Sequence, residues 1–151
     1  MDLATSRAAR FLLDHWDGGN RTEAIPVALR PTSRAMAYDI AAAIGALKGD
    51  VVAGWKIAAT SVAGQKHINV DGPLAGRIFA GRLVQPGSTV DIGGNVMKVG
   101  EAEFAFGFER NLPPRGNDYS RPEVLAAVDH LRLSFEVPDS RFTDFTKAGA
   151  D

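Results

Sequence analysis

Apolar residues recur at helical spacing in the first fifty residues of the chain and at strand spacing in the rest. Residues 2–16 carry Leu3, Phe11, Leu12 and Trp16 near helical spacing, and a run of Asp, Gly, Gly and Asn then ends the pattern. Ser33 offers a cap for a second helix. The apolar stripe of that helix ends before Gly49 and comprises Met36, Ile40, Ile44 and Leu47.

From Asp50 onward the apolar runs become short and are separated by glycine and proline, which predicts strands. The expected strands are residues 51–60, 74–83, 89–92, 97–108 and 131–137. A short helix with Pro122 at an early position is expected before the last strand. The pattern therefore predicts an α+β chain, with a helical part at 1–50 and a β-rich part at 51–151 that form one structural unit.

The strand around Glu101 has the most informative alternation. Period two places Glu101 and Glu103 on one face with Ala105 and Gly107. The other face carries Phe104, Phe106 and Phe108. Burial of these aromatic rings against a core would leave the two carboxylates beside small residues, where an ion or a substrate could approach.

The same alternation recurs in two further strands. In residues 131–137, Glu136 shares one face with Arg132 and Ser134, and the opposite face is apolar. In residues 51–60, Lys56 stands between Gly54 and Ala58. The pattern thus predicts a third carboxylate and one lysine, each on a strand backed by apolar residues.

Three carboxylates in one region repel one another unless a cation neutralises them, and hard divalent ions prefer oxygen ligands. A Mg²⁺ or Mn²⁺ site at Glu101, Glu103 and Glu136 is the natural inference. The alternative from spacing alone is a solvated acidic face, with Lys56 as an ordinary exposed lysine.

Composition narrows the function classes. The 151 residues suit one domain, and 17 basic against 18 acidic residues give a net charge of -1, which does not favour nucleic acid or an anionic membrane as a partner. The chain has no cysteine, so metal ligands must be oxygen or histidine nitrogen. Its histidines lack metal-ligand spacing, and His130 is expected at a helix end. No apolar run suits a signal peptide or membrane span, so we expect a cytoplasmic protein.

Four ordered segments resemble a known family. They read GWKIAATS at 54–61, NVDGPLAGRIF at 69–79, EAE at 101–103 and FEVPDSRF at 135–142. Together they resemble the 2-keto-4-pentenoate hydratase and 4-oxalocrotonate decarboxylase family of the fumarylacetoacetate hydrolase superfamily. The resemblance covers nearly the whole chain, including the helical part.

The resemblance implies a fold, a site and a reaction. The fold is a helical N-terminal part packed on a mixed β-roll. Glu101, Glu103 and Glu136 match the family's metal-binding carboxylates, and Lys56 matches its active-site lysine. The implied reaction adds water to a 2-hydroxy-2,4-dienoate and gives a 4-hydroxy-2-oxo acid, a step in aromatic catabolism.

These residues suit that chemistry, because a 2-oxo acid can chelate a metal that stabilises the developing enolate. Lys56 would add positive charge at the carboxylate or enolate oxygen. Asp71 is a candidate base, although an aspartate before Gly-Pro is also typical of a turn. Arg77 and Arg141 are candidates for holding the anionic substrate, with structural hydrogen bonds as the alternative.

The chain departs from the family in two respects. The family pattern continues beyond Asp151, so we expect exposed sheet edges and apolar faces, and either association or poor stability. Leu74 and Ala75 stand where hydratases commonly carry a more polar or aromatic pair, which leaves the substrate open. Alternatives are a 4-oxalocrotonate-type decarboxylase, an acylpyruvate lyase or hydrolase, and a non-catalytic subunit. We expect a homo-oligomer, or assembly with a related decarboxylase or hydratase.

Overall fold

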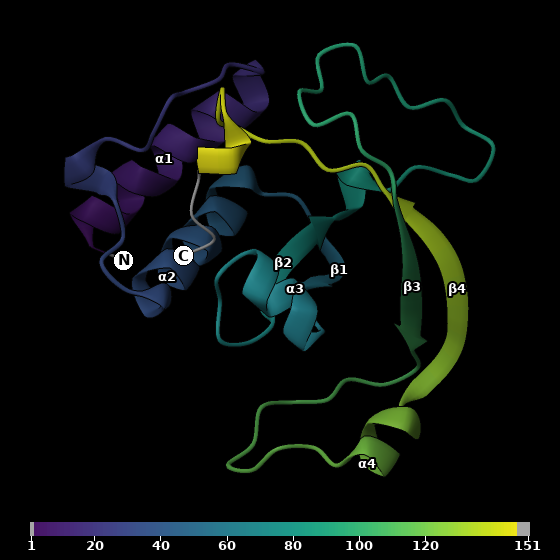
Figure 1. Ribbon diagram of the computed structural model, residues 1–151. Helices are drawn as coiled ribbons and strands as arrows, with labels where there is room; N and C mark the ends of the chain where they lie inside the picture. The colour runs from purple at the N-terminus through teal and green to yellow at the C-terminus, as the bar shows by residue number, and fades with distance from the viewer. Residues whose placement is uncertain (1, 148–151) are drawn as a thin grey trace. The chain divides into compact units, whose positions relative to one another are not determined.

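The computed structural model describes residues 2–147, which combine helices with short strands and confirm the α+β class (Figure 1). Residue 1 and residues 148–151 of the predicted parts lie outside the described residues. The helices are α1 (Leu3–Gly18), α2 (Arg34–Lys48), α3 (Val62–His67) and α4 (Arg121–Leu125), with 3-10 turns η1 (Val27–Leu29), η2 (Ala80–Arg82) and η3 (Phe145–Lys147). The strands are β1 (Val52–Ala58), β2 (Leu74–Phe79), β3 (Glu101–Phe108) and β4 (Val128–Glu136).

Both long helices begin and end close to where the sequence predicts. The Asp2 side chain accepts a hydrogen bond from the Thr5 amide at 2.8 Å and caps α1. Ser33 caps α2 in the same way, because its hydroxyl accepts from the Met36 amide at 3.2 Å. Gly19 and Gly49 follow the two helices at φ of 65° and 66°, a left-handed conformation that glycine adopts without strain.

Contacts divide the chain into two compact units, which are described separately. The first comprises residues up to Val96 and the segment from Ser140, and the second runs from Met97 to Asp139. The segment after Ser140 joins the first unit through Thr22. The Thr22 amide donates to the Arg141 carbonyl at 2.9 Å, and the Thr143 amide donates to the Thr22 carbonyl at 3.0 Å.

The core of the first unit lies between α1 and α2. Small alanines let the two helices approach closely, and larger aliphatic side chains fill the space between them. The buried cluster comprises Ala8, Ala9, Leu13, Ile40, Ala43 and Ile44, and Met36 and Leu47 pack against it. The predicted stripe on the second helix is therefore confirmed as its core-facing side.

Strands β1 and β2 form an antiparallel pair in the first unit. The helices contact this pair through side chains: the Trp16 ring lies 5.8 Å from the Phe79 ring, and the Ala75 amide donates to the Tyr38 hydroxyl at 3.0 Å. In the second unit, β3 and β4 form a separate antiparallel pair. Since the described strands make two separate pairs, the mixed roll stays a prediction.

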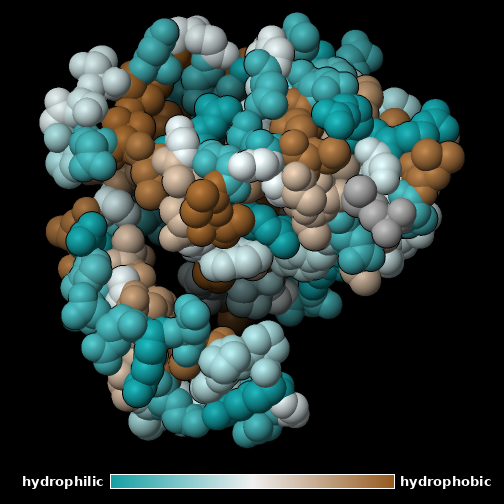
Figure 2. Space-filling view, turned by 180° about the vertical axis from the view of Figure 1, so that it is seen from behind, coloured by the Kyte–Doolittle hydropathy of each residue, from teal (hydrophilic) through white to brown (hydrophobic). Residues whose placement is uncertain are grey.

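The expected burial of the phenylalanines on β3 is wrong for the described structure. Phe104 is 68% exposed, and Phe106 and Phe108 are also exposed. Their cross-strand neighbours on β4 are largely exposed as well, and apolar side chains reach the surface in several other places (Figure 2). Within residues 97–139, the only buried hydrophobic residue of the core is Ala127, so this unit has almost no core of its own.

Several predicted boundaries differ from the structure. Residues 89–92 form no strand, because these few residues find no pairing partner among the described strands. Strand β4 begins at Val128, which places His130 inside a strand rather than at a helix end. Helix α3 was not predicted. No helix among the described residues is long and apolar enough to cross a membrane.

Candidate metal site and the residues around it

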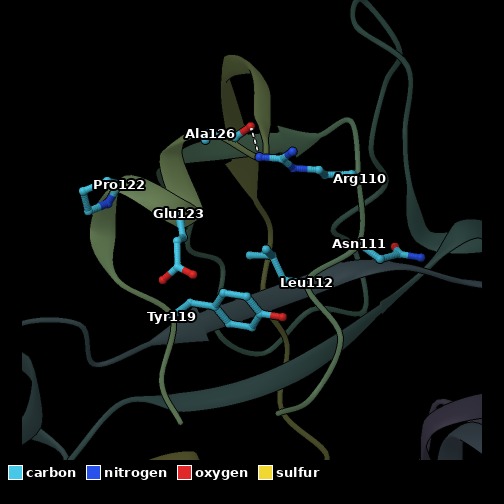
Figure 3. Close-up of a pocket in the computed structure, with 7 residues that line it drawn as sticks. All are labelled: Arg110, Asn111, Leu112, Tyr119, Pro122, Glu123 and Ala126. Carbon is cyan, nitrogen blue, oxygen red and sulfur yellow. Dashed lines mark hydrogen bonds between the residues drawn. The ribbon is translucent and has the colours of Figure 1, made fainter.

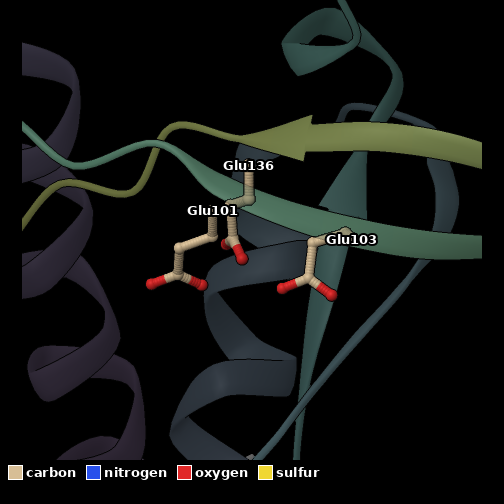
Figure 4. Close-up of side chains that lie close together, drawn as sticks. All are labelled: Glu101, Glu103 and Glu136. Atoms are coloured by element: carbon tan, nitrogen blue, oxygen red, sulfur yellow. The ribbon is translucent and has the colours of Figure 1, made fainter.

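Three glutamates meet on one face of the β3–β4 hairpin. Strand pairing places Glu101 directly opposite Glu136, and Glu103 opposite Ser134. One carboxylate oxygen from each glutamate lies within 4.8 Å of the others. Figure 4 shows the three carboxylates projecting toward the same side of the hairpin. The predicted cluster is thus formed by the backbone register of two strands.

The donor set suits a hard divalent cation. Like charges placed directly opposite each other on paired strands are destabilising, and a bound cation reverses that effect. Mg²⁺ takes oxygen ligands and usually keeps several waters, so three carboxylate oxygens fit part of its coordination shell. Glu103 and Glu136 are half-buried, which strengthens their attraction for an ion relative to fully exposed groups.

The carboxylate-bearing face continues along the hairpin. Ala105 pairs with Arg132, and Gly107 pairs with His130. The His130 ring lies directly over Gly107, where a Cβ would overlap it, and His130 Nδ1 lies 2.7 Å from Asp129 Oδ2. The period-two spacing of Arg132 from Glu136 in the sequence predicts this position on the face.

Lys56 lies on β1 in the first unit, on the strand that was predicted to carry it. Its cross-strand neighbour is Gly76, and its neighbours on the same face of β1 are Gly54 and Ala58. The side chain is half-buried among these small residues. The structure therefore confirms the predicted strand and face of Lys56, and its chemical role stays a prediction.

Asp71 and Arg77 both contact other parts of the first unit. Asp71 is 86% exposed at its side chain and forms an ion pair with Arg34 at 2.5 Å, which connects it to the first turn of α2. The Arg77 guanidinium lies 4.9 Å from the Trp55 ring centroid, in the range of a cation–π contact. Both contacts explain the residues structurally, and their proposed roles at the substrate stay predictions.

Arg141 packs against an aromatic ring of the first unit. Its guanidinium lies 4.6 Å from the Trp16 ring centroid, and Lys48 and Arg82 approach the same ring at 5.0 and 5.2 Å. Burial lowers the pKa of Arg141, and the neighbouring Arg82 charge lowers this pKa further. These contacts place Arg141 within the first unit, and its proposed role at the substrate stays a prediction.

A separate open pocket lies in the second unit, beside α4 (Figure 3). Its volume is about 440 Å³, and it is lined by Arg110, Asn111, Leu112, Tyr119, Pro122, Glu123 and Ala126. Arg115 organises this region through two contacts with Glu123, at 2.8 and 2.9 Å. These bonds and those from Ser120 lower the pKa of Glu123 to about 2. The predicted site residues do not line this pocket.

Comparison with curated protein sequences finds relatives that are named as hydratases. No family model matches the chain. The chain is 32% identical over 97 residues to a 2-keto-4-pentenoate hydratase of Burkholderia vietnamiensis, a match that covers 64% of this chain and 36% of the hydratase. It is 32% identical over 99 residues to a 2-hydroxyhexa-2,4-dienoate hydratase of Comamonas testosteroni, which covers 64% of this chain and 37% of that enzyme. The match thus spans well under half the length of each hydratase.

Comparison with solved structures identifies the fold of the described residues. The 4-oxalocrotonate decarboxylase from Pseudomonas putida G7, complexed with magnesium and adipate, matches with a TM-score of 0.78 at 22% identity. The match covers 93% of this chain and 54% of the decarboxylase, so the chain spans about half the length of that protein. The same decarboxylase complexed with calcium and acetate matches with a TM-score of 0.76.

The fold and the sequence relatives point to the same class of protein. The described residues follow the decarboxylase fold, and the sequence relatives are hydratases of 2-keto-4-pentenoate and of 2-hydroxyhexa-2,4-dienoate. The chain is thus similar in sequence to 2-keto-4-pentenoate hydratases and similar in fold to a 4-oxalocrotonate decarboxylase. The resemblance found in the sequence is thereby confirmed.

Proposed function

We propose that this chain contributes to a divalent-metal-dependent hydratase, which adds water to a 2-hydroxy-2,4-dienoate and gives a 4-hydroxy-2-oxo acid in aromatic catabolism. The observation that carries the proposal is the convergence of Glu101, Glu103 and Glu136 on one face of a hairpin. The hydratase relatives support the reaction, and the magnesium in the decarboxylase complex supports the ion.

The glutamates would hold Mg²⁺ or Mn²⁺ through one oxygen each. When bound, the ion supplies a Lewis acid for the 2-oxo and carboxylate oxygens of the substrate. The three carboxylates would hold that ion on the face of the hairpin that they share, where Ser134 lies opposite Glu103. The described donor set therefore fits the chemistry of a 2-oxo acid.

We propose further roles for residues of the first unit. Lys56 would supply positive charge to the substrate carboxylate or enolate oxygen, from a strand position whose cross-strand neighbour is Gly76. Asp71 would act as the base, and Arg77 and Arg141 would attract the anionic substrate. In these roles Asp71 would give up its ion pair with Arg34 for a contact with the substrate. Arg77 and Arg141 would likewise leave the rings of Trp55 and Trp16.

A turnover assay tests the proposed function. Purified protein is incubated with 2-hydroxypenta-2,4-dienoate in Mg²⁺ and in excess chelator, and loss of the dienoate absorbance is followed. We expect turnover only with the metal, and Lys56→Met should abolish turnover while leaving Mg²⁺ affinity unchanged. Turnover that survives both the chelator and Glu103→Gln would contradict the proposal.

Decarboxylation is the second candidate, because the matched structure is that of a 4-oxalocrotonate decarboxylase. Release of CO₂ from 4-oxalocrotonate, measured beside dienoate hydration, separates the two reactions. Cleavage of an acylpyruvate in the same assay would identify a lyase or hydrolase instead. If the chain binds an active homologue and Glu101→Ala has no effect on that partner's activity, a non-catalytic subunit is the better account.

We also propose a cytoplasmic homo-oligomer. The absence of cysteine fits a reducing compartment. The exposed apolar face of the β3–β4 hairpin supports association, because monomeric proteins rarely expose contiguous apolar patches of several hundred square ångströms.

A further inference from the structure

Three cationic side chains gather around one tryptophan ring of the first unit, Trp16. They come from separate parts of the chain: Lys48 ends α2, Arg82 ends η2, and Arg141 follows β4. Their charged groups lie 5.0, 5.2 and 4.6 Å from the ring centroid, respectively. The indole ring is the aromatic partner that attracts cations most strongly. These four residues form what we call the Trp16 cluster, which concentrates positive charge in the first unit.

The charges of the Trp16 cluster are only partly neutralised. Lys48 forms an ion pair with Asp17 at 2.9 Å, and the Asp17 charge also acts on Arg141. Within residues 2–147, no ion pair involves Arg82 or Arg141. The Arg82 charge acts on Arg141 as well, so the two guanidinium groups repel each other. Three cations beside one carboxylate leave a positive excess that a bound anion would offset.

The two arginines also have hydrogen-bond donors without acceptors. The Nε atom of Arg141 is buried and donates to no atom of the described residues. The terminal nitrogens of Arg141 find no acceptor in residues 2–147 either, but they are not buried, so an incoming anion can reach them. Arg82 is exposed, and its guanidinium makes no hydrogen bond to the described part of the chain. Unpaired donors beside a buried one favour a ligand that supplies acceptor oxygens.

A phosphate group matches these properties better than a single carboxylate does. Its charge approaches about −2 at neutral pH, which suits a cluster with more than one positive charge in excess. Arginine forms paired, charge-assisted hydrogen bonds with phosphate oxygens. Oxygens on different corners of one phosphate can accept from two guanidinium groups, so the repulsion between Arg82 and Arg141 becomes a shared attraction.

We propose that Lys48, Arg82 and Arg141 form an anion site that binds the phosphate group of inorganic phosphate or of a phosphate monoester. This inference goes beyond the proposed metal-dependent function and does not rest on it. The site requires Arg141 where this structure places it, whereas the substrate role proposed above would move its guanidinium away from Trp16. The alternative role of the cluster is to offset the negative dipole ends of α1 and α2, whose last turns carry Trp16 and Lys48.

Tryptophan fluorescence tests this site, because Trp16 and Trp55 are the only tryptophans of the chain. Trp55→Phe leaves Trp16 as the sole emitter, and inorganic phosphate is titrated at constant ionic strength in excess chelator. The chelator removes metal ions, so phosphate cannot bind through an ion at the glutamates. We expect a saturable change in Trp16 fluorescence that chloride does not produce. Arg82→Gln should raise the dissociation constant for phosphate at least about tenfold, and Arg82→Lys should retain part of the affinity.

The controls separate an anion site from a purely electrostatic role. Arg10→Gln changes an exposed arginine of α1 outside the cluster and should leave phosphate binding unchanged. An unchanged urea unfolding midpoint in Arg82→Gln would show that its weaker binding does not come from unfolding. The same fluorescence response to chloride, or an unchanged dissociation constant in Arg82→Gln, would overturn the inference and support the helix-dipole role.

The source of the phosphate group is resolved by a second titration, with glycerol 3-phosphate. Tighter binding of this monoester than of inorganic phosphate would identify a phosphate monoester as the ligand, and equal or weaker binding would identify the free ion. Dienoate turnover with Mg²⁺ is measured separately. Failure of phosphate binding therefore leaves the proposed function standing, and failure of turnover leaves the anion site standing.

Discussion

Glu101 and Glu136 face each other across the β3–β4 hairpin, and Glu103 lies two residues further along the same face. Three negative charges held this close repel one another, so the arrangement favours an ion-bound state. Only one of the three, Glu136, is distant in sequence from the others. The strand register is therefore what turns an acidic pair into a three-carboxylate cluster.

The lowered pKa of Glu123 predicts how the region around α4 responds to acid. Hydrogen bonds from Arg115 and Ser120 stabilise its carboxylate form and lower its pKa from 4.5 to about 2. Since the folded-state pKa lies below the ordinary value, the stabilisation is fully present above pH 4.5 and is lost as the pH falls from there through about 2. The NMR shift of the Glu123 carboxyl carbon should titrate near pH 2, and amide protection in α4 should decline across the same window.

The matched variant is Glu123→Gln, which removes the charge and keeps the length of the side chain. It should reduce amide protection in α4 already at neutral pH and remove the acid-dependent decline. A wild-type carboxyl titration centred at the ordinary glutamate pKa would contradict the assigned hydrogen bonds.

At the scale of elements, the far end of the hairpin depends on a glycine. A Cβ at position 107 would overlap the His130 ring, so Gly107→Ala should displace that ring from Asp129. We expect the free energy of unfolding to fall by about 1 kcal/mol. This value is at the lower end of the usual cost of overpacking, because the His130 ring can rotate away from the new methyl group. Urea unfolding measures the loss, and the NMR signals of His130 report the displacement.

Gly100→Ala is the matched control, because a Cβ there meets no described atom within 4 Å. It should be neutral, or slightly stabilising through reduced freedom of the unfolded chain. Equal effects of the two substitutions would show that the His130 contact does not constrain the hairpin.

Alternation in the sequence predicts elements well where a strand is long and has a partner. The faces of β1, β3 and β4 follow their period-two patterns because pairing holds them extended. Residues 89–92 have a similar local pattern but form no strand, because pairing is not a local property. Helix α3 has six residues, too few to show a helical period.

Residues of the candidate site could be predicted where they lie close together on one strand, but contacts between distant positions could not. The Glu101 and Glu103 pair follows from spacing, and the family resemblance implied that Glu136 joins them as a metal ligand. The register that places Glu136 opposite Glu101 is known only from the structure. The stacking of Arg141 on Trp16 joins positions far apart in the chain, so no local pattern indicated it. The ion pair of Asp71 with Arg34 is equally non-local.

At the scale of the whole molecule, the main feature is the uncovered apolar face of the hairpin. A two-stranded hairpin is marginally stable alone, and this unit has almost no core. The exposed large side chains of this face are Phe104, Phe106, Phe108, Leu131, Leu133 and Phe135. From their exposed fractions, they present roughly 700 Å², close to the area that one partner contributes to a standard interface.

We propose that a second copy of the chain covers this face, in a face-to-face pair with twofold symmetry. Leu133 is 81% exposed near the middle of the face, so Leu133→Ser should shift the protein toward monomer. Leu3→Ser is the matched control, since Leu3 is 76% exposed on α1 of the other unit. Sedimentation velocity over a concentration series measures the shift.

Cross-linking locates the interface directly, because the native chain has no cysteine. Leu133→Cys should form a covalent dimer on mild oxidation, whereas Leu3→Cys should form much less. A wild type that is monomeric at every concentration, or equal cross-linking of the two variants, would show that another segment or partner covers the face.

The most direct measurement of the central claim is a Mn²⁺ titration followed by electron paramagnetic resonance, with Mg²⁺ as competitor. We predict one bound ion per chain in the wild type, displaced by Mg²⁺, and affinity lowered at least about tenfold in Glu101→Gln, Glu103→Gln and Glu136→Gln, because each loses one of three charged ligands. Glu109→Gln, an exposed glutamate just beyond β3, should bind as the wild type does. Wild-type affinity in all three cluster variants would contradict the assignment of this hairpin as the metal site.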